Sequence, residues 1–304
     1  MRVFVTGASG FIGSAVVREL LDAGHQVLGL ARSDRSAAAV EAAGAEVHRG
    51  DLDDLDGLRA GAAACDGVIH TAFVHDFVDD AAGGTDQFAV YAAAADKDRL
   101  AIEAMGEALA GSGRPLVVSS GTVGGSEAGV LTEDTVLSRD LPRLSEQTAL
   151  PFAERGVRAS AVRLPTVHGR GDHGFVPQLI RIARKRGVSG YPGDGSNHWA
   201  AVHRLDAARL FRLAVEAAPA GTRLHAVAEE GVPVREIAEA IGRGLNVPVT
   251  SVPLEAADEH FGILGLFFSR DIRASSERTR KLMDWRPERP GLIADLDEGH
   301  YFDE

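Results

Sequence analysis

The sequence has few of the residues that build disulfides, metal cages or basic surfaces. Cys65 is the single cysteine among 304 residues, which excludes an internal disulfide and a cysteine metal cage. The only lysines are Lys97, Lys185 and Lys281, and the formal net charge is −12. Such a charge argues against nucleic acid or an anionic membrane as the main partner.

Long apolar runs are also missing. None approaches the roughly 20 residues needed to span a bilayer. The chain begins with a strand-like run rather than with a charged segment followed by an apolar one, so we see no signal peptide. We therefore expect a cytoplasmic protein whose partner is a small molecule.

The first half of the chain alternates short β-branched runs with helical patterns. Strands that alternate with helices predict an α/β fold with a doubly wound parallel sheet, and continuously apolar strands indicate that helices cover both faces. We expect strands at 2–6, 26–31, 46–49, 67–71, 116–119 and 158–163, and helices at 11–23, 37–43 and 91–110.

The second half changes character, because prolines punctuate it and short extended pieces alternate with helical patterns at 175–185, 205–217 and 234–242. We expect a first domain over residues 1–165 and a smaller α/β lobe over 166–304. A return of the chain to the main sheet stays open, so we expect no clean boundary between them.

A glycine-rich segment, TGASGFIG at 6–13, follows the first expected strand and opens a helix. Gly7 permits a tight turn, Gly10 lets the backbone approach a pyrophosphate, and Gly13 lets helix and strand pack closely. The helix N-terminus favours negative charge through its free N–H groups and its dipole. The motif predicts a dinucleotide site that includes Gly7, Ser9, Gly10, Phe11, Ile12 and Gly13.

This TGxxGxxG spacing resembles the extended and atypical short-chain dehydrogenase/reductases. Further segments resemble the family in order along the chain: GDL at 50–52, VIHTA at 68–72, VVSSGT at 117–122, RLPTVHG at 163–169, VHRLD at 202–206 and MDWRP at 283–287. The resemblance implies a Rossmann fold with a smaller C-terminal substrate-binding lobe. It also implies cofactor contacts from Asp51, Leu52, Thr71, Ala72, Phe73, Ser119, Pro165, Val167 and His168.

The end of the second expected strand bears on which cofactor binds. NAD-binding proteins usually carry an acidic residue there, which bonds the ribose hydroxyls. Here Arg32 stands about where the acid would be, followed by Ser33 and Arg35, and a guanidinium can bind a 2′-phosphate with a forked pair of hydrogen bonds. We favour NADPH, while Asp34 and stacking of Arg32 on adenine keep NADH possible.

The family's usual catalytic pair is absent. The resemblance implies a Tyr as acid/base, with a Lys four residues later that lowers the phenol's pKa and holds the ribose. No tyrosine of this sequence has a lysine at that spacing, and the range 136–155, where the helix is expected, holds neither residue. Thr122 and Ser120, at the hydroxyl-rich end of the fifth strand, are the candidate catalytic residues. His168 and His203 are candidates for a proton relay, with packing as the alternative.

Three functions stay open. The first is a ketoreductase whose substrate helps to protonate itself, since a ketone flanked by a phenol or enol hydroxyl, as in aromatic polyketides, carries its own donor. That reading points to secondary metabolism and antibiotic biosynthesis. The second is a non-catalytic NADP(H) sensor. The third is a nucleotide-sugar epimerase or dehydratase, which the loss of Tyr and Lys disfavours.

The most apolar stretch is FGILGLFF at 261–268, which either packs as core or covers a hydrophobic ligand. Since the family's C-terminal lobe builds the substrate site, we predict a helical lid over 255–273 above an apolar substrate. We expect substrate contacts from Phe73, His75, Phe261, Leu264, Phe267 and Phe268. We expect no metal site, and the sequence leaves a monomer and a homodimer equally open.

Overall fold

The main sheet has seven strands in the order β10-β6-β5-β4-β1-β2-β3, all paired in parallel. They are β1 (Arg2–Thr6), β2 (Gln26–Ala31), β3 (Glu46–Arg49), β4 (Gly67–His70), β5 (Pro115–Gly121), β6 (Arg158–Leu164) and β10 (Thr222–His225). The strand order reverses at β1, as it does in a doubly wound sheet. The predicted fold class is therefore confirmed. The computed structural model describes residues 1–304 apart from 75–86, 124–128, 140, 263 and 304.

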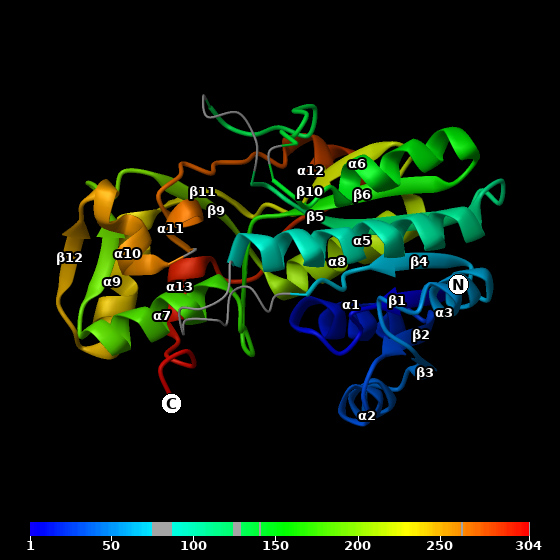
Figure 1. Ribbon diagram of the computed structural model, residues 1–304, viewed down its shortest axis with the longest axis horizontal. Helices are drawn as coiled ribbons and strands as arrows, with labels where there is room; N and C mark the ends of the chain where they lie inside the picture. Colours follow the sequence, from blue (N-terminus) through cyan, green and yellow to red (C-terminus); the bar gives the residue numbers. More distant parts are fainter. Residues whose placement is uncertain (75–86, 124–128, 140, 263, 304) are drawn as a thin grey trace.

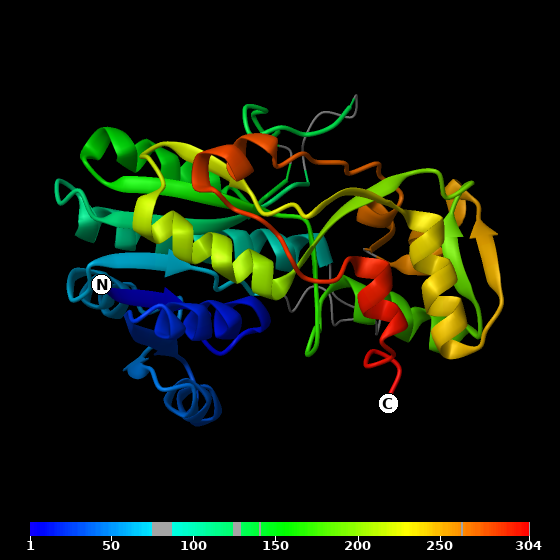
Figure 2. The ribbon, with the colours of Figure 1, turned by 180° about the vertical axis from the view of Figure 1, so that it is seen from behind.

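Helices cover both faces of this sheet, as Figures 1 and 2 show from opposite sides. One face carries α3 (Leu55–Ala63), α5 (Gln87–Leu109), α6 (Ser145–Ala149) and the 3-10 helix η1 (Leu150–Arg155). The other carries α1 (Phe11–Asp22) and α8 (Arg204–Ala217), with α12 (Glu277–Met283) beside α8 and β10, while α2 (Asp34–Ala42) packs against β2 and β3.

The alternation of side chains along β1 shows why its sequence is continuously apolar. Val3 and Val5 belong to the core under α1 and α8, whereas Phe4 belongs to the core under α3 and α5. Successive side chains of a strand point to opposite faces, so a strand covered on both sides needs apolar residues at every position.

The smaller lobe combines two small sheets with short helices. β7 (Thr166–His168) pairs with β9 (His198–His203), which pairs with β11 (Glu229–Pro233); β8 (Ser189–Pro192) pairs with β12 (Val249–Val252). Its helices are α7 (Phe175–Arg186), α9 (Val234–Leu245), η2 (Leu254–Ala256), α10 (Ala257–Phe261), α11 (Leu264–Phe268) and α13 (Leu292–Asp297). The range 166–304 also contains α8 and β10, so the chain does return to the main sheet.

The predicted lid forms the short helices α10 and α11, and four of its apolar side chains are buried in the smaller lobe, whereas Leu266 is exposed. Phe261, Leu264, Phe267 and Phe268 are 4%, 3%, 7% and 1% exposed. The ring of Phe268 packs edge-on against Trp199, with centroids 5.1 Å apart. This packing favours the core interpretation of the stretch, and contact of these four residues with a substrate stays a prediction.

Two of the segments that resemble the family, VHRLD at 202–206 and MDWRP at 283–287, contact each other at the start of α8. Trp285, which is fully buried, donates its indole N–H to the carbonyl oxygen of Asp206 at 3.0 Å. The carboxylate of Asp206 accepts the backbone N–H groups of Glu288 and Arg289. The tail that follows α12 is thereby fastened to the start of α8 before it enters the smaller lobe.

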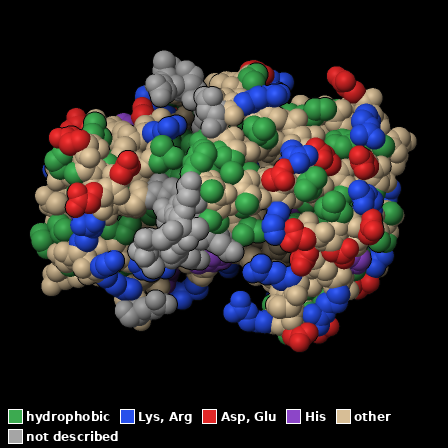
Figure 3. Space-filling view, in the orientation of Figure 1, with side chains coloured by type: hydrophobic (Ala, Val, Ile, Leu, Met, Phe, Trp, Pro, Cys, Tyr) green, Lys and Arg blue, Asp and Glu red, His purple; other side chains and the backbone are tan. Residues whose placement is uncertain are grey.

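The surface of one face is shown in Figure 3, where acidic and basic side chains are spread over the part built on the main sheet. Hydrophobic side chains gather toward the middle of this face. Within the described ranges, no helix is both long and apolar enough to cross a membrane.

Candidate functional site

The turn between β1 and α1 has the shape that the glycine motif predicts. Gly7 has φ +70°, and a Cβ there would lie 2.8 Å from the backbone nitrogen of Ala72. A Cβ at Gly13 would lie 2.0 Å from the carbonyl oxygen of Gly7. No side chain caps α1 and no acidic residue occupies its first turn, so its first N–H groups are available to a phosphate.

The carboxyl ends of β1, β4, β5 and β6 form one edge of the sheet, where a doubly wound fold binds its ligand. The hydroxyl of Thr71, just after β4, donates to the carbonyl oxygen of Thr6 at the end of β1, at 2.8 Å. The backbone N–H of Thr122, just after β5, donates to the carbonyl oxygen of Leu164 at 3.1 Å. The structure thus brings together the predicted site residues of the first, fourth, fifth and sixth strands.

The end of β2 presents the predicted cationic group. Arg32, Ser33 and Arg35 are all exposed, and the Ser33 hydroxyl caps α2 by accepting the backbone N–H of Ser36 at 3.2 Å. Asp34, the acidic alternative for the ribose, pairs at the surface with Arg49 at 2.7 Å. Binding of a 2′-phosphate at this position stays a prediction.

Asp51 and Leu52 follow β3. The carboxylate of Asp51 accepts the backbone N–H groups of Asp53 and Asp54 at 2.9 and 3.1 Å, so it holds the turn before α3. Leu52 packs against the core under α3 and α5. Both residues have these structural tasks, and their contact with adenine stays a prediction.

Three hydroxyl side chains lie at the end of β5 and differ in their partners. Ser119, Ser120 and Thr122 are 3%, 7% and 3% exposed. The Ser119 hydroxyl accepts a hydrogen bond from Arg143 at 3.0 Å. Within the described part of the chain, neither Ser120 nor Thr122 has a side-chain hydrogen bond, so both hydroxyls are available to a ligand.

A chain of buried, hydrogen-bonded side chains, which the sequence did not predict, lies next to these strand ends. The Thr6 hydroxyl lies 2.7 Å from Nδ1 of His70, and Nε2 of His70 lies 3.1 Å from Oδ1 of Asp98 on α5. Ser145, at the start of α6, donates its hydroxyl to Oδ2 of Asp98 at 2.6 Å. Burial alone would raise the pKa of Asp98, but the charge of Arg143 and the bonds from His70 and Ser145 outweigh it and lower that pKa.

Arg143 ends this chain at the sheet edge. Its Nε donates to the Ser145 hydroxyl at 2.9 Å, and its guanidinium lies over the ring of Phe73, 4.1 Å from the centroid. The range 136–155 also contains Arg139 and Arg155, which are exposed, whereas Arg143 is partly buried. The sequence signal for Arg143 was therefore only its place in that range.

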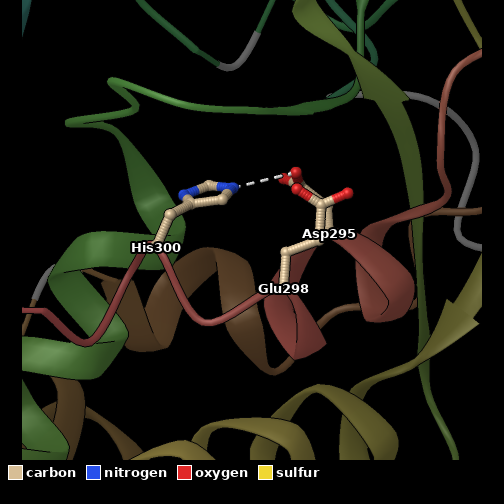
Figure 4. Close-up of side chains that lie close together, drawn as sticks. All are labelled: Asp295, Glu298 and His300. Atoms are coloured by element: carbon tan, nitrogen blue, oxygen red, sulfur yellow. Dashed lines mark hydrogen bonds and ion pairs between the residues drawn. The ribbon is translucent and has the colours of Figure 1, made fainter.

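The C-terminal segment reaches the site through Asp295 on α13. Asp295 accepts hydrogen bonds from Nδ1 of His168 at 2.9 Å and from Nε2 of His300 at 3.0 Å, and it lies close to Glu298 (Figure 4). Burial opposes the charge of Asp295, yet these bonds and the charges of the two histidines lower its pKa to about 2. The oxygens of Asp295 are thus engaged by the protein's own side chains, which fasten the segment to β7.

His168 and His203, the candidates for a proton relay, pack edge to face with centroids 5.5 Å apart. His168 is fully buried, and its Nε2 has no hydrogen-bond partner within the described residues. His203 caps α8 by accepting the backbone N–H of Leu205 at 3.2 Å. Burial and the neighbouring His168 lower the pKa of His203 to about 4, so it is neutral at physiological pH.

Asp172 and Tyr301 complete this cluster. Burial raises the pKa of Asp172 to about 6, despite hydrogen bonds from the backbone of Gly174 and from Tyr301. Burial and the charge of Asp172 raise the pKa of Tyr301, which therefore stays protonated and donates. Val167 and Pro165 lie beside the cluster in and before β7. His75, predicted as a substrate contact, falls outside the described residues.

The fold and the turn after β1 define a nucleotide-binding protein of the Rossmann type. The chain belongs to the NAD dependent epimerase/dehydratase family, whose model matches residues 3–227. Membership of an NAD-dependent family supports a nicotinamide cofactor, in agreement with the shape of the turn.

Individual relatives give a similar picture. An uncharacterized protein of Schizosaccharomyces pombe is 52% identical, over 99% of this chain and all of its own length. The 4-hydroxy-2-methyl-3-oxo-4-farnesyl-3,4-dihydroquinoline-1-oxide ketoreductase of Stigmatella aurantiaca is 28% identical, over 84% of this chain and 78% of its own. The dTDP-glucose 4,6-dehydratase DesIV of Streptomyces venezuelae, solved with NAD and TYD bound, has a TM-score of 0.75 at 22% identity and is covered over 96% of its length, against 98% of this chain. This last similarity shows the fold.

Proposed function

We propose that this chain is an NADPH-dependent ketoreductase that acts on a bulky, apolar ketone. One observation carries the proposal: the open N-terminus of α1 and the available hydroxyls of Ser120 and Thr122 belong to the same edge of the sheet. A nicotinamide nucleotide bound along that edge supplies a hydride. Ser120 and Thr122 are then the side chains that hydrogen-bond the ketone or the nicotinamide.

The choice of NADPH rests on charge. Arg32 and Arg35 are exposed at the end of β2, while Asp34 is engaged with Arg49. A guanidinium fork matches a phosphate in both geometry and charge, whereas neutral ribose hydroxyls accept hydrogen bonds but offer no opposite charge.

The substrate class follows from the ketoreductase relative and from the missing Tyr–Lys pair. The substrate in that relative's name carries an oxo group beside a hydroxyl-bearing carbon and a farnesyl chain. A ketone flanked by a hydroxyl supplies its own hydrogen-bond donor to the developing charge. Aromatic polyketides belong to this class, and secondary metabolism is then the physiological setting that we propose.

A second candidate is a nucleotide-sugar epimerase or dehydratase. The family's description and the resemblance of the fold to the dTDP-glucose dehydratase favour it. The sequence disfavours it, because such reactions move a proton reversibly and no tyrosine here has the matching lysine.

The test is to mix the purified protein with NADPH or NADH and a panel of bicyclic ketones, with and without a neighbouring hydroxyl, and to follow nicotinamide oxidation. We expect oxidation of NADPH with hydroxyl-flanked members of the panel. Turnover of nucleotide sugars with NAD⁺ and none of ketones would favour the second candidate. Tight binding of NADPH without any turnover would indicate a sensor, and no nucleotide binding would refute all three.

A further inference from the structure

The guanidinium of Arg143 is held at the end of β5 by groups from three elements. Its Nη2 donates to the carbonyl oxygen and to the hydroxyl of Ser119, both at 3.0 Å. Its Nε donates to the hydroxyl of Ser145 at the start of α6. The Phe73 ring packs on its face at 4.1 Å from the centroid. An arginine fixed on this many sides has little freedom left to lose on binding a ligand.

The groups around Arg143 balance its charge and leave its side chain within reach of a ligand. Oδ1 of Asp98 lies 4.0 Å from Nη2 of Arg143. The two carboxylate oxygens of Asp98 are hydrogen-bonded to His70 and Ser145, so Asp98 balances the charge of the guanidinium without hydrogen-bonding to it. Burial raises the pKa of Tyr91 on α5, and the nearby charge of Arg143 opposes that rise. The arginine side chain is 19% exposed, so a ligand can reach it.

The three nitrogens of the Arg143 guanidinium differ in their hydrogen-bond partners. Arginine carries five N–H donors, two of them on Nη1. Within the described residues, Nη1 has no hydrogen-bond partner, whereas Nε and Nη2 are both engaged. Two charged donors at the edge of the sheet where the nucleotide is expected therefore have no acceptor among the described residues.

We propose that Arg143 is the catalytic cation of this enzyme, and that its Nη1 donors hold the oxygen of the ketone as that oxygen becomes an alkoxide. The inference rests on the proposed reductase function and names the group that does the work of the missing Tyr–Lys pair. With NADPH bound, a C–H bond of its dihydronicotinamide would break as a new C–H bond forms at the carbonyl carbon, which oxidises NADPH to NADP⁺, and the π electron pair of the C=O bond moves to oxygen. Arginine stays charged at physiological pH, so Arg143 keeps its protons and the alkoxide takes one from water.

The kinetic test compares Arg143→Gln and Arg143→Lys with the wild type. Removing a preorganised donor to an oxyanion costs about 100- to 1000-fold in kcat, so we expect a loss of that size in the Gln variant. KM for the ketone and the affinity for NADP⁺ change little, and Lys restores part of kcat because it keeps the charge without the fork. Arg114→Gln is the matched control, since Arg114 is an anchored arginine at the other end of β5 that bonds backbone carbonyls.

A binding test reads the same charge without turnover. We use 2-naphthol, an apolar phenol, with the protein and NADP⁺, and follow its ionisation by absorbance. The wild type and Arg114→Gln should lower the pKa of bound naphthol, and Arg143→Gln should lose this lowering. If the Gln variant has no cooperative melt, Arg143→Met replaces it, because the thioether keeps packing on the Phe73 ring.

The outcomes separate the inference from the function on which it rests. If the wild type reduces ketones while Arg143→Gln matches it in kcat and in naphthol ionisation, the inference is overturned and the reductase stands. If the wild type binds NADP⁺ but reduces no ketone, the proposed function fails. An unchanged naphthol pKa in the wild type would then also remove Arg143 as an oxyanion donor.

Discussion

At the scale of single residues, the site has exposed arginines at one end and partly buried titratable groups at the other. Arg32 and Arg35 stand in solvent at the end of β2, whereas Asp172 and His203 are held near the C-terminal segment with shifted pKa values of opposite effect. The exposed arginines are the predicted partners of a phosphate, and the partly buried groups make stability depend on pH.

Arg32→Ala should weaken NADPH binding and leave NADH binding nearly unchanged. A hydrogen bond to a charged group contributes about 1.5–3 kcal/mol, which corresponds to roughly a 10- to 100-fold loss of affinity for the 2′-phosphate form. Calorimetry with both nucleotides measures it, and Arg59→Ala on α3 serves as the control. Equal weakening of both nucleotides would show that Arg32 stacks on adenine instead.

Asp172→Asn should steepen the rise of stability with pH. The pKa of His203 is lowered from 6.5 to about 4. Between these two pH values His203 is protonated more in the unfolded state than in the native state, so stability rises with pH across that window. The pKa of Asp172 is raised from 3.8 to about 6. Between these two pH values Asp172 is protonated more in the native state than in the unfolded state, so stability falls with pH across nearly the same window. The two effects oppose each other in the wild type, and the Asn variant keeps only the first.

Thermal melts from pH 4 to pH 7 measure this difference. We expect the melting temperature of Asp172→Asn to gain on the wild type as pH rises, and Asp56→Asn, an exposed site on α3, to follow the wild type. Parallel curves for Asp172→Asn and the wild type would contradict the shifted pKa of Asp172.

At the scale of elements, the turn from β1 to α1 separates two uses of glycine. At Gly13 a Cβ would collide with the carbonyl oxygen of Gly7 at 2.0 Å, so glycine is needed for packing. At Gly10 a Cβ would meet only that same oxygen at 3.2 Å, and the backbone is extended, with φ −79° and ψ 176°. The prediction for Gly10 is instead that it lets a ligand approach the backbone.

The variants Gly13→Ala and Gly10→Ala should consequently fail in different ways. Gly13→Ala forces α1 away from β1 and lowers both the melting temperature and nucleotide affinity. Gly10→Ala keeps the melting temperature close to that of the wild type but loses affinity for NADP⁺. Melts and titrations on both proteins decide this, and a Gly10→Ala protein that binds NADP⁺ normally would remove the predicted pyrophosphate contact.

At the scale of the whole molecule, the part built on the main sheet and the smaller lobe have separate hydrophobic cores, and the chain passes between them more than once. The core of the smaller lobe is built from α7, α9, α10, α11 and α13 around Trp199 and Phe268. Because α8 and β10 return to the main sheet, folding of the lobe depends on segments from both sides of that return.

Phe268→Ala tests whether the apolar stretch at 261–268 is core. Truncation of a buried phenylalanine costs about 3–5 kcal/mol, so we expect a clearly lower free energy of unfolding. NADP⁺ affinity of the folded protein should stay unchanged, because Phe268 lies in the smaller lobe. Phe88→Ala, at a site 51% exposed on α5, is the control. Normal stability combined with weaker substrate binding would restore the lid interpretation.

The sequence by itself predicted six of the seven strands of the parallel sheet, several of its helices and the nucleotide turn, but not β10 or α3. Each depends largely on neighbours in the chain: apolar runs such as Val3–Val5, and a glycine spacing that brings Gly13 against the carbonyl oxygen of Gly7. Only the tertiary structure decided that Phe261, Leu264, Phe267 and Phe268 are buried in the smaller lobe.

Only the tertiary structure, too, assembled Arg143 with Ser119 and Asp98, and Asp295 with His168, which is 127 positions away. These contacts join side chains of common types with no local pattern between them. Their positions follow from strand order and helix packing, which act over the whole chain.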